Sequence, residues 1–321
     1  MAGYYPEGRL IGKEENLNAL TSLSSLNEAY NERRILEARA IVCDSQHNLI
    51  VDLGVMKGII PREEGAIGIK EGKVRDIAVI SRVNRPVCFI ITDFRKNEAG
   101  KTIAILSRRL AQERCMKEYV NNLYPGDVID AKITHLDSFG AFADIGCGII
   151  SLIPIDSISV SRIDHPKERF RVGMEIRAVV RAFEDGRISL THKELLGTWE
   201  ENVANFSIGE TVAGIIRSVE DYGAFVELAP NLAGLAEIKD NIIPGQQASV
   251  YIKNIIPSRM KIKLIIIDTF DYDYTPALPD YYFTGDHMDH FRYSPEESSK
   301  IIETNFELMY PEREAVLSSC I

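Results

Sequence analysis

The sequence predicts an all-β protein made of three tandem five-stranded barrels, joined by short helices and followed by a small C-terminal extension. Two observations predict this fold. An internal repeat recurs at a constant offset of 83 residues, and each copy consists of short β-branched runs separated by Gly, Asp and Asn. With 321 residues the chain can bury several small cores rather than one large one.

The repeat is clearest between residues 124–145 and residues 207–228, where YPGDV and FGAFADI recur as SIGET and YGAFVEL. In the upstream copy the apolar runs predict strands at residues 128–135, 139–145, 149–153, 175–183 and 187–191. Asp185 and Gly186 predict a two-residue hairpin turn between the last two strands. The downstream copy has residues 254–259 in that place, which predicts a longer turn, and it lacks part of the loop before its fourth strand.

A fainter copy lies upstream, where VDLG at residues 51–54 and IAILSRR at residues 103–109 match landmarks of the other two copies in order. Residues 107–123 and 193–205 contain few helix-breaking residues, which predicts linking helices. The expected organisation is a helical or loose segment at 1–34, a degenerate barrel at 35–115, barrels at 123–206 and 207–268, and an acidic, aromatic-rich segment at 269–321.

Composition narrows the class of protein. No run of about 18 apolar residues is present, so a membrane span is not expected, and the N-terminus has no basic and apolar leader, which predicts a cytoplasmic protein. The net charge is −10, but between Asp268 and Glu314 twelve acidic residues face three basic ones, so the rest of the chain is nearly neutral. The cysteines form no Cys-x-x-Cys pair and are expected to be buried apolar residues: Cys43, Cys88, Cys115, Cys147 and Cys320.

These motifs resemble the S-one RNA-binding repeat, a five-stranded OB-fold named for the largest protein of the bacterial small ribosomal subunit. The resemblance rests on PGDV at residues 125–128, FGAF at 139–142, DIG at 144–146 and the closing RISLTHK at 187–193. GTWE at residues 197–200 resembles the linker that follows such repeats. The resemblance covers roughly residues 35 to 268 and implies a bacterial, RNA-binding chain.

In that family an aromatic pair, a His on the third strand and basic residues near the last two strands bind single-stranded RNA. The resemblance implies that the RNA-binding residues here are Phe139, Phe142, Arg162, His165, Arg187, Lys193, Tyr222, Phe225, Lys253 and Lys261. Pro154 and Glu237 stand where the family has the His. The first copy has His47 and Ile50 at the aromatic positions, and by resemblance it faces protein rather than RNA.

Proteins bind single-stranded RNA with little sequence preference by stacking bases on aromatic rings and by contacting phosphates with cationic side chains. Strict alternation would put Phe139 and Phe142 on opposite faces, so a shared face requires a bulge, which Gly140 and Gly223 would permit. The alternative is that one ring of each pair, Phe142 or Phe225, belongs to the core. Basic residues cluster at 162–193 and 253–263; each one alone could equally belong to a solvated strand face.

Two features favour other interpretations. Residues 286–290 (DHMDH) contain metal-ligand side chains, although a mixed, acidic, Pro-flanked segment is more typical of a turn. The aromatic residues of the C-terminal segment predict that it packs on the barrels, either as a cap on the shortened third barrel or in competition with RNA.

The sequence therefore predicts a non-enzymatic protein without cofactor or metal that binds single-stranded mRNA and acts in translation. Its expected partners are RNA and proteins of the small ribosomal subunit, with no membrane. Two alternatives stay open: a protein-interaction adaptor whose RNA face has decayed, and an RNA-binding accessory of an RNA-degrading complex. No phosphate-binding loop, G-x-S-x-G elbow or H-E-x-x-H motif occurs in the sequence.

Overall fold

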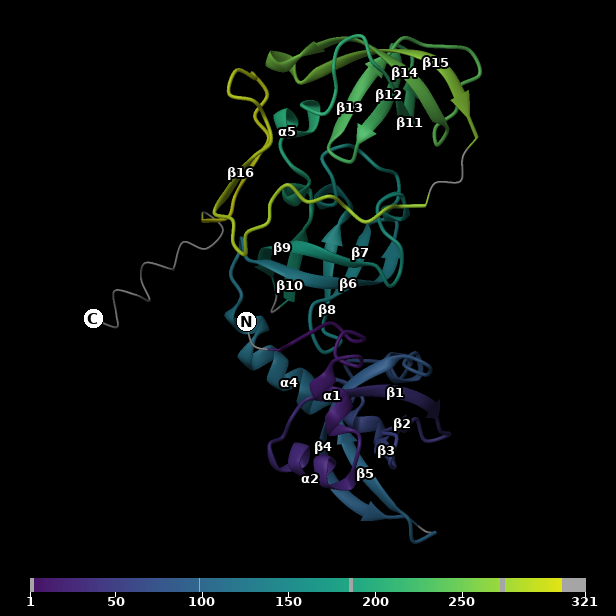
Figure 1. The fold of residues 1–321 in the computed structure, drawn as a ribbon, viewed down its shortest axis with the longest axis vertical. Helices are drawn as coiled ribbons and strands as arrows, with labels where there is room; N and C mark the ends of the chain where they lie inside the picture. Colours follow the sequence, from purple (N-terminus) through teal and green to yellow (C-terminus); the bar gives the residue numbers. More distant parts are fainter. Residues whose placement is uncertain (1–2, 98, 185–186, 272–274, 308–321) are drawn as a thin grey trace, which may run out of the picture. The chain divides into compact units, whose positions relative to one another are not determined.

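The computed structural model describes residues 3–97, 99–184, 187–271 and 275–307. They form two compact units (Figure 1). The first unit comprises residues up to 123 together with residues 144–150, and the second comprises residues 124–143 and those from 151 onward. In the described part of the chain, no helix is long and apolar enough to cross a membrane.

The first unit contains the degenerate barrel and its helices. Its strands are β1 (Leu36–Cys43), β2 (Leu49–Asp52), β3 (Lys57–Ile60), β4 (Pro86–Lys96) and β5 (Thr102–Ser107). Its helices are α1 (Glu14–Ala19), α2 (Leu23–Asn31), η1 (Arg62–Glu64), α3 (Ile77–Ile80), α4 (Arg108–Glu118) and η2 (Val120–Asn122). The segment at residues 1–34, predicted to be helical or loose, contains two helices. α1 ends at Ala19, and the Ser22 side chain caps α2 by accepting a hydrogen bond from the Ser25 N–H at 3.1 Å.

The second unit contains two further barrels and the C-terminal segment. The strands of the second barrel are β6 (Val128–Asp137), β7 (Gly140–Asp144), β8 (Ile150–Pro154), β9 (Glu175–Glu184) and β10 (Arg187–Thr191). Those of the third are β11 (Thr211–Glu220), β12 (Gly223–Ala229), β13 (Leu232–Ala236), β14 (Gln247–Ile256) and β15 (Lys261–Phe270). The remaining elements are η3 (Ile155–Ser157), η4 (Pro166–Glu168), η5 (Lys193–Leu196), α5 (Trp199–Val203), η6 (Pro257–Arg259), β16 (His290–Arg292) and β17 (Glu303–Asn305).

All three barrels close with one topology. The strand orders are β1-β2-β3-β5-β4, β10-β8-β7-β6-β9 and β11-β12-β13-β15-β14 (Figure 1). The third and fifth strands of each barrel pair in parallel. The fourth strand pairs antiparallel with both the fifth and the first. Closure leaves no long unpaired edge on any barrel. The predicted fold class, tandem five-stranded OB-fold barrels, is confirmed.

The predicted strands of the second barrel agree with the observed ones to within two residues at each end. Asp185 and Gly186, the predicted hairpin turn, lie outside the described residues. The predicted longer turn is present, since four residues separate β14 from β15 whereas two separate β9 from β10. It begins after Ile256 rather than at residue 254, because β14 continues to Ile256 and pairs there with Lys261 of β15. Only η6 and Met260 remain as the turn, and Met260 takes a left-handed conformation with φ of 47°.

The described part of the C-terminal segment packs against both barrels of the second unit. Met288, Phe291, Tyr293 and Phe306 are buried in one apolar cluster with Trp199 of α5, which also holds core residues of the second and third barrels. The Trp199 N–H donates to the Tyr293 carbonyl at 3.0 Å. The segment therefore folds back onto the barrels, as its aromatic content predicts.

Cys88, Cys115 and Cys147 are buried free thiols, and Cys43 is half-buried. The prediction of buried apolar cysteines is confirmed for the first three. Cys320 lies outside the described residues.

Candidate nucleic-acid interface

The second barrel presents two aromatic rings side by side. Phe139 lies in the two-residue turn between β6 and β7 and is 52% exposed, while Phe142 lies on β7 and is half-buried. Their ring centroids are 5.8 Å apart and the ring planes are perpendicular. The backbone of Phe139 is fixed, because its carbonyl accepts a hydrogen bond from the Ile155 N–H at 2.9 Å. Both rings therefore belong to one surface.

The third barrel repeats this arrangement. Tyr222 lies in the turn between β11 and β12 and is 69% exposed, and Phe225 on β12 is half-buried. The ring centroids are 6.2 Å apart with an interplanar angle of 88°. Two copies of the same edge-to-face pair at the repeat offset indicate that the pair is a property of the repeat. The alternative that Phe142 and Phe225 are pure core residues does not fit, because each ring is partly exposed and contacts the exposed ring.

The predicted bulge at Gly223 is not observed. Ala224, Phe225 and Val226 of β12 pair in unbroken register with β13, and the bulge lies on the neighbouring strand β11, between Ile216 and Ser218. Tyr222 reaches the face of Phe225 because it precedes the strand and so escapes strand alternation.

The two glycines are needed for a different reason, which is close packing. A Cβ on Gly140 would lie 2.5 Å from the carbonyl oxygen of Ile153, and one on Gly223 would lie 2.6 Å from that of Ala236. Both carbonyl oxygens belong to the backbone of the third strand of the barrel, which neighbours the second. Glycine therefore lets that strand approach the start of β7 or β12, directly behind the exposed ring.

In the third barrel, the strand registers show which residues of β13 and β15 lie on the same face as Phe225. Phe225 of β12 pairs with Leu235 of β13, and Leu235 pairs with Lys263 of β15. Residues opposite each other in register point to the same face. Lys263 is exposed, as is Lys261 two residues before it on the same face. Aromatic and cationic side chains thus share one surface.

In the second barrel, the residues in register across the corresponding strands differ from those of the third barrel. Leu152 of β8 pairs with Ser189 of β10, so Ser189 occupies the place that Lys263 has in the third barrel. Arg187, two residues before Ser189, is exposed and corresponds to Lys261. The predicted positions of Arg187 and Lys261 on the aromatic faces therefore agree with the registers.

The other predicted cations lie elsewhere. Arg162 and His165 are in the loop between β8 and β9, where His165 caps η4 by accepting from the Lys167 N–H at 3.0 Å. Lys193 is half-buried in η5 and donates to the Asp156 carbonyl at 3.4 Å. Lys253 is the residue that bulges from β14.

Lys253 is also paired, because its ammonium lies 3.6 Å from the carboxylate of Glu237. Glu237 stands where the resemblance expects a His. Pro154, at the other such position, is the half-buried last residue of β8. Neither barrel thus has an imidazole at this place, and in the third barrel the substituted carboxylate partly neutralises a nearby lysine.

Sequence reasoning missed His135 on β6. Its exposed imidazole lies 5.8 Å from the ring of Phe142, with the two planes 32° apart. No sequence signal indicated it, because only the structure shows that the equivalent residue of the third barrel, Ser218, pairs with Phe225. The second barrel therefore has three neighbouring rings, in the order Phe139, Phe142 and His135.

Comparison with known proteins agrees with this geometry. Residues 123–193, which hold the Phe139–Phe142 pair and Arg187, match the family described as the S1 RNA binding domain. The second barrel matches this family along all five of its strands, and we refer to it as the S1 domain. The recognition of the S-one family from its motifs is thereby confirmed.

The chain is also similar to curated ribosomal proteins. It is 28% identical over 237 residues to small ribosomal subunit protein bS1 of Rhizobium meliloti, a match over 69% of this chain and 40% of that protein. It is 28% identical over 277 residues to bS1 of Staphylococcus aureus, over 81% of this chain and 68% of that protein. The chain thus spans two fifths to two thirds of the length of these relatives.

Among solved structures, a multidomain protein with nucleic acid binding domains from Streptococcus pneumoniae aligns over 73% of each chain, with 12% identity and a TM-score of 0.24. A score this low adds nothing to the assignment, which rests on the domain match and on the bS1 relatives.

The first barrel lacks the aromatic pair of the S1 domain. His47, at the first aromatic position, lies in the turn before β2 with its Nδ1 at 3.3 Å from a carboxylate oxygen of Asp76. Ile50 of β2, at the second position, is half-buried. This barrel therefore offers no paired rings to bases at the place where the S1 domain does.

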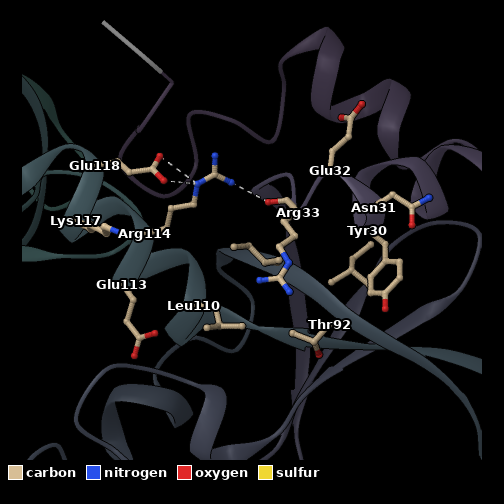
Figure 2. A pocket seen from close by; sticks show the side chains of 12 residues that line it. Tyr30, Asn31, Glu32, Arg33, Thr92, Leu110, Glu113, Arg114, Lys117 and Glu118 are labelled. Atoms are coloured by element: carbon tan, nitrogen blue, oxygen red, sulfur yellow. Dashed lines mark hydrogen bonds and ion pairs between the residues drawn. The ribbon is translucent and has the colours of Figure 1, made fainter.

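The first unit has a cavity of about 990 Å³ between the end of α2, β4 and α4 (Figure 2). Figure 2 shows Arg114 bridging Glu118 and the backbone of Arg33. Its charged lining residues balance, with the basic Arg33, Arg114 and Lys117 and the acidic Glu32, Glu113 and Glu118. Tyr30 is the one ring in its lining, so this cavity lacks the ring pair of the S1 domain.

The C-terminal segment binds the S1 domain along β6 and β9. Arg177 of β9, one of the clustered cations, donates to the Phe283 carbonyl at 2.9 Å and to the Gly285 carbonyl at 2.5 Å. The Val128 N–H donates to the Asp286 carbonyl at 2.8 Å. Arg177 is therefore engaged by protein and does not belong to the aromatic face.

His287, from the predicted metal-ligand motif, has a structural role in the same contact. Its Nδ1 lies 2.6 Å from Asp127 and its Nε2 lies 3.0 Å from Asp289. Among the residues that the structure describes, no group of three or more His, Cys, Asp and Glu side chains could hold a metal ion. The turn interpretation of residues 286–290 is wrong as well, because His287 forms an antiparallel β-bridge with Asp127 and His290 begins β16.

Proposed function

We propose that this chain is a non-enzymatic protein that holds single-stranded RNA on the aromatic faces of its second and third barrels. The observation that carries the proposal is the repeated ring pair, with one exposed and one half-buried ring on the same face in both barrels. A cation stands on the same face in each: Arg187 in the second barrel and Lys261 in the third.

These residues suit unpaired RNA. Each base of a single strand exposes a π-face, and stacking on one aromatic side chain contributes about 1–3 kcal/mol per base. Cations along the strand edge contact phosphates and release counterions, which gives a salt-dependent affinity. A duplex hides its base faces, so the ring pairs select single strands.

The test is fluorescence anisotropy of a labelled mixed-sequence single-stranded RNA titrated with the whole chain. We expect binding that weakens as salt rises, and a loss of at least tenfold in affinity for the double variant Phe139→Ala, Tyr222→Ala. Both side chains are exposed, so thermal unfolding of this variant should match the unsubstituted protein. Equal affinity of the two proteins would overturn the proposal and favour the protein-adaptor alternative.

We further propose that the RNA is mRNA and that the chain acts in translation at the small ribosomal subunit, as its similarity to bS1 suggests. The first barrel, which lacks the ring pair, would be the protein-facing part. Co-sedimentation of the chain with purified small subunits tests this step. Co-sedimentation that survives Phe139→Ala, Tyr222→Ala supports a protein anchor, while co-purification with an RNA-degrading complex instead of the subunit would support the accessory role.

A further inference from the structure

The aromatic faces of the second and third barrels differ at two equivalent places. Where the second barrel has His135 the third has Ser218, and where the third has Lys263 the second has Ser189. Each barrel thus has one ring or cation at a position where the other has serine.

In the second barrel the difference adds a ring. His135 is exposed, and its plane is within 32° of that of Phe142, whereas Phe139 is perpendicular to Phe142. A base stacked on Phe142 therefore meets a second ring of similar orientation on its β6 side. In the third barrel the same position is Ser218, directly opposite Phe225, and it offers no π-surface.

In the third barrel the difference adds a charge. Lys263 is exposed and pairs with Leu235, which in turn pairs with Phe225, so Lys263 lies on the face of the ring pair, with β13 between them. No hydrogen bond or ion pair of its side chain is present among the described residues, in contrast to Lys253, which pairs with Glu237. In the second barrel Ser189 donates its hydroxyl to the Ala182 carbonyl at 3.4 Å and brings no charge.

We infer that the two barrels hold single-stranded RNA by different means: the second by a three-ring stacking surface that includes His135, and the third by two rings together with a phosphate contact from Lys263. The inference rests on the proposed function and assigns RNA-binding roles to two residues beyond those of the ring pairs. Its consequence is that binding at the third barrel depends more strongly on salt than binding at the second.

The physical basis is that stacking and phosphate contact respond differently to salt. Each phosphate neutralised on a single strand steepens the dependence of log affinity on log salt by about 0.7, whereas stacking of neutral rings releases no counterions. A stacking residue and a phosphate-binding residue can therefore be told apart even when their substitutions weaken binding equally.

The experiment uses the whole chain and a short labelled oligouridylate, with one barrel silenced at a time. Tyr222→Ala silences the ring pair of the third barrel and Phe139→Ala that of the second. In the Tyr222→Ala background, His135→Ala is expected to weaken binding about fivefold or more with the salt slope unchanged, and His135→Phe to preserve the affinity. In the Phe139→Ala background, Lys263→Ala is expected to lower the slope by about 0.7.

The serines provide matched gain-of-function controls at exposed or partly exposed positions. Ser218→His should tighten binding by the third barrel without a change in slope, and Ser189→Lys should steepen the slope of the second. Thermal unfolding of each variant checks that the fold is intact.

Loss of affinity with Phe139→Ala or Tyr222→Ala, but none with His135→Ala or Lys263→Ala, would overturn this inference and leave the proposed function intact. A change of slope with His135→Ala would also overturn it, because it would mean that His135 acts as a cation. Absence of RNA binding by the unsubstituted chain at low salt would overturn both.

Discussion

The Tyr281 hydroxyl lies 3.2 Å from Nε2 of His192, and the Nδ1 of the same imidazole lies 3.1 Å from the Ile158 carbonyl. Because a carbonyl can only accept, Nδ1 carries the proton and Nε2 accepts from Tyr281. The Tyr281 oxygen in turn accepts a hydrogen bond from the Arg177 N–H at 2.9 Å. This chain of bonds attaches the C-terminal segment to the S1 domain through a buried, neutral histidine.

The first prediction is a pH dependence of this attachment. Burial lowers the pKa of His192 to about 4, from an ordinary value of 6.5. As pH falls below 6.5 the unfolded chain therefore binds a proton that the folded chain does not, so stability falls between pH 6.5 and 4. We expect the second unit to lose on the order of 2 kcal/mol of unfolding free energy between pH 7 and 5.

Urea unfolding followed by the fluorescence of Trp199, the one tryptophan of the chain, measures this loss. The control is His192→Gln, which removes the titrating group. This variant is less stable at neutral pH but should lose much less on acidification to pH 5. An equal loss in the variant would assign the pH dependence to other groups.

A second prediction concerns a buried ion pair in the first unit. The Glu7 carboxylate accepts hydrogen bonds from Arg108 at 2.6 and 2.9 Å and from the Cys88 N–H at 3.1 Å. Burial opposes its ionisation, but Arg108 and Arg82 outweigh burial and hold the pKa of Glu7 below its ordinary value. The Glu7 N–H also donates to Asp144 at 2.8 Å, within the same unit.

Glu7→Ala leaves the Arg108 guanidinium buried without its carboxylate, and we expect a loss of about 3–5 kcal/mol in the stability of the first unit. The matched control is Glu32→Ala, which removes an exposed pair with Arg34 and should cost about 1 kcal/mol or less. Denaturant unfolding compares the two variants. Similar losses would contradict the structural role assigned to Glu7.

A third prediction separates the cations of the S1 domain. Arg177→Ala should leave the salt slope of RNA binding unchanged, because its guanidinium is bonded to the C-terminal segment. Arg187→Ala should lower the slope by about 0.7, since Arg187 is exposed on the aromatic face. Salt titrations of both variants measure this. A lower slope for Arg177→Ala would mean that RNA displaces the segment, which is the competition alternative.

A fourth prediction tests the packing behind the exposed ring. Gly140→Ala places a Cβ 2.5 Å from the Ile153 carbonyl oxygen, so β7 and β8 must separate. We expect a loss of about 1–3 kcal/mol in unfolding free energy. At Gly12 a Cβ meets nothing within 4 Å, so Gly12→Ala should leave stability nearly unchanged. Equal stability of Gly140→Ala and the unsubstituted chain would contradict the close approach.

The repeat made the fold predictable, because landmarks at a constant offset imply the same strands in the same order. It also predicted the ring pairs, since Phe139 and Tyr222 stand beside a glycine at equivalent places. The bulge was predicted at the wrong place, because two rings can share a face through a bulge at the glycine or through a register shift on the neighbouring strand β11. Only the pairing of β11 with β12 distinguishes them.

The cations were harder to predict, because a cluster of basic residues in the sequence does not determine which surface of the barrel each side chain faces. Arg187 and Lys261 lie on strands of the aromatic faces, but Arg162 and Lys193 lie in a loop and a short helix. His135 was missed since it lies on the first strand, outside the motifs that carry the resemblance, and becomes significant only through its contact with Phe142.

The most direct test of the central claim is ultraviolet crosslinking of single-stranded RNA to the whole chain, with the crosslinked peptides located by mass spectrometry. The account predicts crosslinks at Phe139 and Tyr222, the most exposed rings of the two faces. Neighbouring crosslinks are expected at Phe142, His135 and Phe225. Crosslinks confined to the first barrel or to the C-terminal segment, with none on the two aromatic faces, would contradict it.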